Sequence, residues 1–186
     1  LGTLRVDTAY GGDSFVMVDA ARTGFAIEPD EAADIAQMGM RITAAANEQL
    51  GFIHPQNADW AHISFCLFAG APTKTAEGLA ARSAVAVRPG KVDRSPTGTA
   101  VSARMAVLAA RKQMSVGQTL LATSIIGSQF TGKIVAELML DGHPAIVPEI
   151  SGRAWITGIH QHMLDPEDPW PSGYRLRDTW GHSGAV

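Results

Sequence analysis

The segment from Ala100 to Ala110 restricts the fold more than any other part of the sequence. Only Ser102 and Arg104 are polar in it, so a helix at this position has almost no polar side. A helix that is apolar all round is a buried helix. Its many alanines would let surrounding strands approach closely. The sequence therefore predicts a helix that runs through the middle of a β-structure.

The segments around this helix are mostly typical of strands. Alternating, β-branched or aromatic residues predict strands at 3–9, 14–19, 60–70 and 83–88. After the helix, apolar runs interrupted by glycines predict a meander, and two or three short strands then follow around Pro148 and Gly152. A long amphipathic helix is expected over residues 30–50. Many strands with two helices predict an α+β fold whose sheet wraps around a helix.

Composition limits the kinds of partner and the cellular compartment. The chain has 186 residues, enough for one sizeable domain or one lobe of a larger enzyme. The net charge is -3 and no basic block occurs, which argues against nucleic acid as a partner. No apolar run reaches the roughly 18 residues of a membrane helix. The single cysteine, Cys66, excludes an internal disulfide and favours a reducing cytoplasm. Leu1 already opens a strand-like pattern, so we expect a segment that precedes it.

The entrance to the apolar helix is Thr97-Gly98-Thr99. A helix leaves its first four N–H groups unpaired, and at a buried helix these donors need an acceptor. Ser95 or Thr97 could cap them with a side-chain oxygen. Alternatively, Gly98 leaves the helix mouth open for an anion, such as the carboxylate of a small substrate, which the helix dipole would attract. The pattern alone leaves both interpretations open.

Several long segments resemble one protein family. The strings "VDRSPTGTAVSARMAVLAARKQMSVGQ", "SIIGSQFTGKI" and "PEISGRAWITG" are similar to the second half of the proline racemase family. That family includes proline racemases, 4-hydroxyproline 2-epimerases and trans-3-hydroxy-L-proline dehydratases. The strings "VDTAYGGDSFVMVDA", "HPQNADWAHISF" and "DPEDPWPSGYRL" also resemble family segments, in the expected order. The resemblance extends to about Trp180.

This resemblance implies a fold of two similar lobes, as in diaminopimelate epimerase. Each lobe is a mixed, mostly antiparallel β-structure around a central buried helix. Residues 1–165 would form the second lobe, and residues 166–186 a C-terminal segment that returns toward a first lobe outside the given sequence. The substrate, a hydroxyproline or proline, would lie between the lobes without a metal or pyridoxal cofactor. The sequence also leaves open whether the protein forms a homodimer.

Thr97 departs from the pattern of the racemases and epimerases. The resemblance implies that those enzymes have a cysteine at this position, just before Gly-Thr. A thiol can be acidic enough to exchange a carbon-bound proton, whereas a threonine hydroxyl is far too weak an acid. Racemisation needs two acid/base groups, but a dehydratase needs one base and a leaving hydroxyl. The threonine resembles the trans-3-hydroxy-L-proline dehydratase branch, a hydro-lyase of amino-acid catabolism that produces Δ1-pyrroline-2-carboxylate. The base would belong to the first lobe, and Thr97 would position substrate or help the hydroxyl leave.

Two alternatives to a dehydratase remain. One is a racemase or epimerase of the same family, which Thr97 disfavours. The other is a non-catalytic homologue whose helix mouth only binds proline.

The resemblance also assigns roles around Thr97. Asp93 would accept a hydrogen bond from the substrate ring nitrogen; its alternative is a loop carboxylate or a partner of Arg94. Gly98 and Thr99 would offer backbone N–H groups to the substrate carboxylate. His62, expected in an apolar strand, would contact a substrate hydroxyl or be a core histidine with a satisfied hydrogen bond.

Three further features have mainly structural explanations. His160 and His162 would share one face of a strand, a spacing found in metal sites, but no third ligand is near in sequence. Cys66 is expected to be a small core residue rather than a nucleophile. Arg104, inside the apolar helix, must find a partner or reach solvent.

Overall fold

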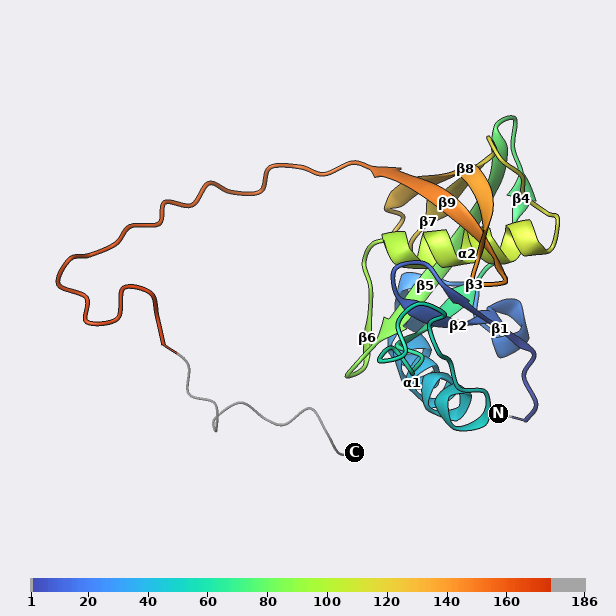
Figure 1. The fold of residues 1–186 in the computed structure, drawn as a ribbon, viewed down its shortest axis with the longest axis horizontal. Helices are drawn as coiled ribbons and strands as arrows, with labels where there is room; N and C mark the ends of the chain where they lie inside the picture. The colour runs from blue at the N-terminus through green and yellow to red at the C-terminus, as the bar shows by residue number, and fades with distance from the viewer. Residues whose placement is uncertain (1, 175–186) are drawn as a thin grey trace. The chain divides into compact units, whose positions relative to one another are not determined.

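The computed structural model describes residues 2–174. The chain divides into two compact units, Leu1–Arg153 and Ala154–Val186. The described strands and helices all belong to the first unit (Figure 1). In the second unit, residues 154–174 contain two turns, closed by Asp168 N–H to Asp165 O and by Gly173 N–H to Trp170 O. No helix among the described residues is long and apolar enough to cross a membrane.

Nine strands form a single curled sheet in the first unit (Figure 1). The main order is β1 (Val6–Tyr10), β2 (Ser14–Asp19), β3 (Phe65–Ala69), β5 (Gly78–Val87), β7 (Thr119–Thr123), β8 (Gln129–Leu140) and β9 (His143–Gly152). Two short strands, β4 (Thr73–Lys74) and β6 (Lys91–Val92), pair with β5. The β2–β3 and β5–β7 pairs are parallel and the other pairs antiparallel. The expected α+β architecture is confirmed.

Two long helices pack on opposite faces of this sheet. α1 (Ala32–Gln49), entered through the short 3₁₀ helices η1 (Ala21–Thr23) and η2 (Pro29–Glu31), connects β2 to β3. α2 (Gly98–Ala110) connects β5 to β7. Because β3 and β5 are antiparallel, β5 runs opposite to β2. Crossovers of the usual right hand then place their helices on opposite faces of the sheet.

The central strands are buried on both faces for this reason. Along β2, Val16 and Val18 join the core under α1, whereas Phe15 and Met17 join the core under α2. Strands β3 and β5 alternate in the same way. Since both faces are covered, these strands contain apolar runs, 15–18, 65–69 and 84–87, instead of alternating between apolar and polar residues.

The predicted central helix is confirmed. Ala100 and Ala103 pack against side chains of β2, β3 and β5. Val101, Met105 and Leu108 pack against the other half of the sheet, on side chains of β7 and β8. The sheet therefore curls around α2, and this enclosure explains why the helix has almost no polar side.

Three strand predictions are corrected by the structure. The strand expected over 60–70 begins only at Phe65, because the Asn47 side chain bonds both the N–H and the carbonyl of Ile63, each at 2.8 Å. β9 continues through Pro148, which is tolerated because β9 is an edge strand. No strand follows β9 within residues 153–174, so the strand proposed for His160 and His162 is wrong. A strand needs a neighbour with which to pair, and these residues have none in the part of the chain described.

Gly11, in the turn between β1 and β2, lies directly against α2. A Cβ atom at this position would be 2.2 Å from the Thr99 carbonyl oxygen and 2.4 Å from the Ala103 nitrogen. We therefore expect Gly11→Ala to lower the free energy of unfolding by about 1–3 kcal/mol, measured by denaturant titration. Gly98→Ala is the matched control, since its Cβ would meet only Ile150 Cγ2 at 3.8 Å. Equal stabilities of the two variants would contradict this packing.

Cys66 is a core residue of β3, as the sequence predicts. It is fully buried between its strand neighbours Val16 and Ala86. Burial raises the pKa of the Cys66 thiol, because the thiolate would be poorly solvated. We expect no reaction with a thiol-specific disulfide reagent at mildly alkaline pH in the folded chain, and complete reaction in denaturant. Rapid labelling of the folded protein would show that Cys66 is accessible.

Candidate functional site

The loop that leads into α2 is organised by the Asp93 carboxylate. The Asp93 N–H first extends the sheet by donating to Val85 O at 2.9 Å. Its Oδ1 accepts from Ser95 N–H at 3.1 Å, and its Oδ2 accepts from the hydroxyls of Ser95 at 3.2 Å and Thr97 at 2.5 Å. Within residues 2–174 Asp93 forms no ion pair with Arg94. The carboxylate thus holds the loop together and brings Asp93 and Thr97 into contact.

Thr97 has an unusual backbone conformation, with a φ of +61°. A β-branched residue rarely occupies this region, and such strain costs on the order of 1–3 kcal/mol. The Thr97 N–H donates to Ser95 Oγ at 3.1 Å, and the Thr97 carbonyl accepts from Val101 N–H at 2.9 Å. The conformation directs the side chain back to Asp93 instead of over the helix.

The first amides of α2 are consequently left without a cap. Neither Ser95 nor Thr97 places a side-chain oxygen on them. Among the described residues, no acceptor is found for the N–H groups of Gly98, Thr99 and Ala100. Of the two interpretations that the sequence left open, the geometry therefore favours a mouth that is open to an anion over a helix that is only capped.

Two other parts of the sheet border this mouth. The β1–β2 turn approaches from one side, since a Cβ on Gly12 would be 2.9 Å from Thr99 Cγ2. Strand β9 approaches Gly98 through Ile150. Thr97, Gly98 and Thr99 are each half-buried between these neighbours. The mouth is thus bordered by protein on these two sides, while no side chain caps its amides.

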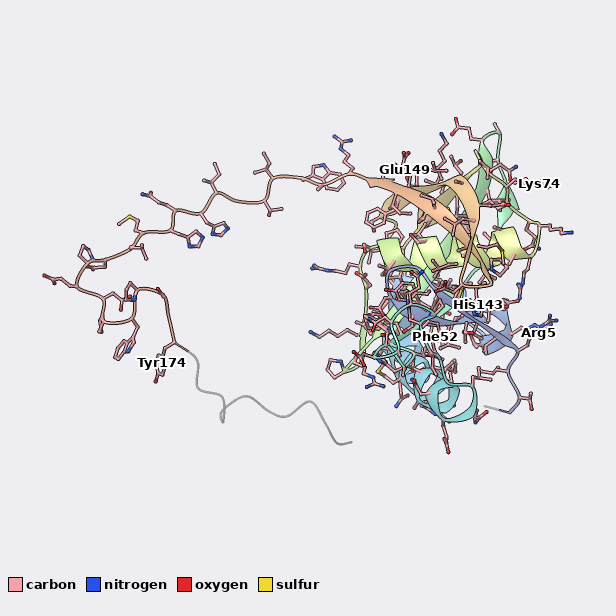
Figure 2. All side chains as sticks on the ribbon, in the orientation of Figure 1. Arg5, Phe52, Lys74, His143, Glu149 and Tyr174 are labelled. Carbon is pink, nitrogen blue, oxygen red and sulfur yellow. The ribbon has the colours of Figure 1, made fainter. Side chains whose placement is uncertain are left out.

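A cavity of about 650 Å³ runs along α2 from Ser102, one helical turn after the mouth. It lies between β1 with its turn, the loop 52–55, and β9. Phe52 and His143, both labelled in Figure 2, line it. Tyr10 also lines it and contacts the rings of His54 and Trp60, with centroids 4.5 Å and 5.8 Å away. Sequence reasoning missed this aromatic wall, although the string "HPQNADW" carries two of its rings.

His62 lies in the loop before β3 and is exposed, so its expected position in an apolar strand is wrong. Its ring stacks on Trp60 at 5.4 Å, and its carbonyl accepts from Ser14 Oγ at 2.7 Å. Ser14 follows the β1–β2 turn that borders the helix mouth. A contact between His62 and a substrate hydroxyl stays a prediction.

His160 and His162 lie in the second unit with ring centroids 6.4 Å apart. Among residues 2–174, no group of three or more histidine, cysteine or acidic residues is placed to hold a metal ion. The histidine pair therefore gives no argument for a metal site.

Comparisons with known proteins show the family and the fold. A family model described as proline racemase matches residues 1–175. The chain belongs to the proline racemase family. The fold is accordingly of the diaminopimelate epimerase type, as the resemblance implied.

Two solved structures are similar to the chain over 96% of its residues. One is a hydroxyproline epimerase from Agrobacterium vitis with bound trans-4-hydroxy-L-proline, at 37% identity and a TM-score of 0.76. The other is a probable proline racemase from Agrobacterium radiobacter K84 with bound carbonate, at 36% identity and a TM-score of 0.76. The chain covers 50% and 51% of those proteins, so it spans about half of their length.

Asp93 should matter for stability, because it orders the loop through three hydrogen bonds. We expect Asp93→Ala to lower the free energy of unfolding by about 1–3 kcal/mol, since bonds to a carboxylate are stronger than neutral ones. The measurement is denaturant unfolding of the 186-residue chain. Glu77→Ala is the control, because Glu77 is exposed and its carboxylate forms no ion pair within residues 2–174. An Asp93→Ala variant as stable as this control would show that the loop is held by other contacts.

Proposed function

We propose that this chain is one lobe of a cofactor-independent enzyme that dehydrates trans-3-hydroxy-L-proline to Δ1-pyrroline-2-carboxylate. Three assignments belong to this proposal. Residues 1–165 form the second lobe, residues 166–186 form a segment that returns to the other lobe, and the enzyme is cytoplasmic. The observation that carries the proposal is the hydroxyl of Thr97, bonded to Asp93 at the mouth of a buried helix.

The open amides of α2 support the binding of an amino-acid carboxylate. The N–H groups of Gly98 and Thr99 have no acceptor among the described residues, and the positive end of the helix dipole adds to their attraction for an anion. Known relatives have a hydroxyproline or a carbonate bound, and both ligands carry such oxygens. A substrate carboxylate at this mouth would fix the ring next to Thr97.

Asp93 retains the capacity to accept a hydrogen bond from the ring ammonium. Its Oδ2 already accepts two hydrogen bonds, whereas its Oδ1 accepts one. A carboxylate oxygen has two lone pairs, so Oδ1 has one acceptor position left. The same residue would then hold both Thr97 and the substrate nitrogen.

Thr97 is better suited to position the substrate than to exchange a proton. Its hydroxyl hydrogen is directed to Asp93, so its oxygen presents lone pairs to the site. It would accept the hydrogen of the substrate 3-hydroxyl and orient that group. To donate a proton to the leaving oxygen instead, Thr97 would have to break its bond to Asp93.

The reaction then needs one base, which we assign to the other lobe. The base removes the proton from Cα, and the electron pair forms a double bond between Cα and C3. The same base, now protonated, would return this proton to the 3-hydroxyl, which leaves as water. The resulting enamine becomes Δ1-pyrroline-2-carboxylate by shifting a proton from nitrogen to C3. No second acid/base group is needed at Thr97, whereas inversion at Cα would need one.

An epimerase or racemase is the second candidate, because both similar solved structures are described by these names. The deciding experiment uses the protein at the full length that its gene encodes. It is incubated separately with trans-3-hydroxy-L-proline, trans-4-hydroxy-L-proline and L-proline. We expect a ring imine from the first substrate alone. Inversion at Cα of either of the other two, detected by chiral chromatography, would overturn the dehydratase. Failure of all three to react, with binding retained, would favour a non-catalytic homologue.

The role of Thr97 is tested in the same protein. We expect Thr97→Val to lower kcat/KM for dehydration by roughly 10- to 100-fold, because one hydrogen bond in a walled site is lost. Thr75→Val is the matched control, since Thr75 is exposed and its hydroxyl has no partner in the structure. Unchanged dehydration by Thr97→Val would remove Thr97 from the mechanism.

A further inference from the structure

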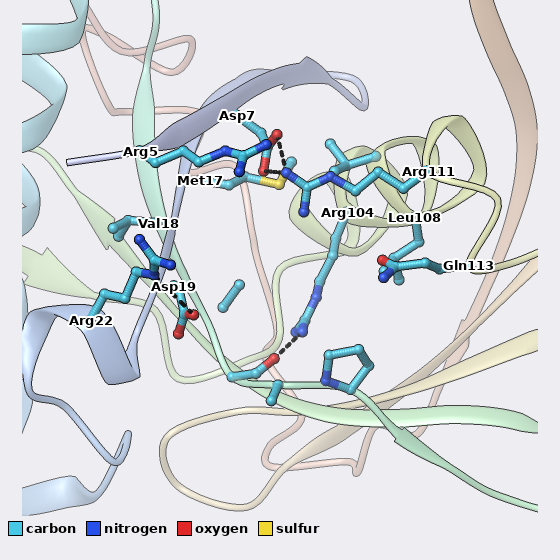
Figure 3. A pocket seen from close by; sticks show the side chains of 15 residues that line it. Arg5, Asp7, Met17, Val18, Asp19, Arg22, Arg104, Leu108, Arg111 and Gln113 are labelled. Atoms are coloured by element: carbon cyan, nitrogen blue, oxygen red, sulfur yellow. Dashed lines mark hydrogen bonds and ion pairs between the residues drawn. The ribbon is translucent and has the colours of Figure 1, made fainter.

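A second cavity, of about 350 Å³, lies beside the C-terminal half of α2 and away from the helix mouth. Arg104 and Arg111 contribute to it from α2 and its C-cap. At about 1.5 Å of rise per residue, Arg111 is roughly 20 Å along the helix from Gly98. The rest of the lining comes mainly from β1, from the end of β2 and from the residues after β3 (Figure 3). This cavity therefore has no part in the site proposed above.

The charged side chains around this cavity are mostly basic. It is lined by four arginines and two aspartates: Arg5, Arg22, Arg104, Arg111, Asp7 and Asp19. Asp7 is engaged by Arg111, whose Nη2 donates to both carboxylate oxygens at 2.6 and 2.7 Å. Asp19 lies 4.0 Å from Arg22. Each aspartate thus has an arginine partner, and two arginine charges are left over.

The two remaining cations are Arg5 and Arg104. Within residues 2–174, Arg5 forms no hydrogen bond or ion pair. In Figure 3 its side chain and that of Arg111 point toward one another. Of these two arginines only Arg111 is paired with a carboxylate, so the positive charge of Arg5 is not offset by an ion pair within residues 2–174 at this wall of the cavity.

Arg104 is the more unusual of the two, because it is only 5% exposed. It donates to the carbonyls of Arg82, at 3.0 Å, and of Gly70, and within residues 2–174 to no carboxylate. Burial lowers the pKa of Arg104 to about 10, so it is still a cation at neutral pH. A buried charge without an opposite charge is costly, and an anion in the cavity would offset that cost.

We propose that this cavity binds a small phosphate dianion, held by Arg5 and Arg104. Guanidinium groups offer forked pairs of N–H donors that match phosphate oxygens, and Arg104 uses only two of its five donors on carbonyls. The charge of such an anion equals the surplus of two arginines. The volume is sufficient for inorganic phosphate or for a small phosphate monoester, which share the recognised group.

The test is calorimetric titration of the 186-residue chain with inorganic phosphate, with chloride at matched ionic strength as the salt control. We expect saturable binding of phosphate and none of chloride. Arg5→Gln should weaken phosphate binding by roughly tenfold or more, as the loss of a charged hydrogen bond implies. Arg104→Lys, which keeps the charge but loses the fork, should weaken it as well. If Arg104→Lys does not fold, Arg5→Gln decides.

Arg41→Gln is the matched control, because Arg41 is an exposed arginine of α1 outside the cavity lining. Its phosphate affinity should equal that of the unchanged chain. The proposal is overturned by equal heats from phosphate and chloride, by an Arg5→Gln variant that binds as the unchanged chain does, or by an equal loss in Arg41→Gln. If phosphate bound at the α2 mouth instead, the Arg5→Gln variant would bind it as tightly as the unchanged chain does. A parallel titration with glycerol phosphate shows whether an ester or the free ion fits better, and tighter binding of either supports the site.

Discussion

The structure depends on enclosing α2 on every side, and Arg104 makes this possible at the point where β5 changes partners. Residues Ser83 to Ala86 of β5 pair with β3, whereas Gly78 to Arg82 pair with β7. At this junction the Arg104 guanidinium bonds the carbonyls of Gly70 and Arg82. The Gly70 N–H also donates to Arg82 O at 3.0 Å, so Arg104 adds a second donor to that carbonyl and one to Gly70 O, and thereby ties both halves of the curled sheet to α2. The two halves then close around the helix.

Once α2 is enclosed, its two ends acquire different chemical environments. At the N-terminal end, the first amides have no side-chain cap, and Thr97 turns its hydroxyl away from them toward Asp93. The helix dipole is then available to a ligand instead of to a cap. Toward the C-terminal end, arginines gather where the dipole is negative, which is the favourable sign for cations. The arginines thus lie toward the negative end of the α2 dipole, and the positive end is left to attract an anion.

Much of this fold could be predicted from the sequence, because α2 and the central strands are buried and their segments are therefore mostly apolar. The strands β1 and β2 and the helix α1 were indicated by periodicity, and the helix α2 by the absence of a polar side. The errors arose where a single side chain or a position in the sheet overrides the local pattern. Asn47 takes both backbone groups of Ile63, and Pro148 is accepted only because β9 is at an edge. Neither fact can be known before the topology is known.

The candidate site was predictable only in part, for a similar reason. Asp93 and Thr97 are close in sequence, so their proximity followed from the loop itself. The aromatic wall around Tyr10 and the arginine cavity, in contrast, join residues that are distant in sequence. Such clusters depend on strand pairing and on the crossing of α2 over β1. Charge and aromatic content gave no indication of where these residues would meet.

The positive φ of Thr97 has a consequence for how a ligand meets this loop. The conformational cost of this backbone is met when the protein folds, because Asp93 and Ser95 already hold the residue in place. A ligand that arrives at the mouth does not have to order the loop. The free-energy loss that normally accompanies such ordering is then absent from the binding step. In this sense the mouth of α2 is preorganised by the side chains of its own loop.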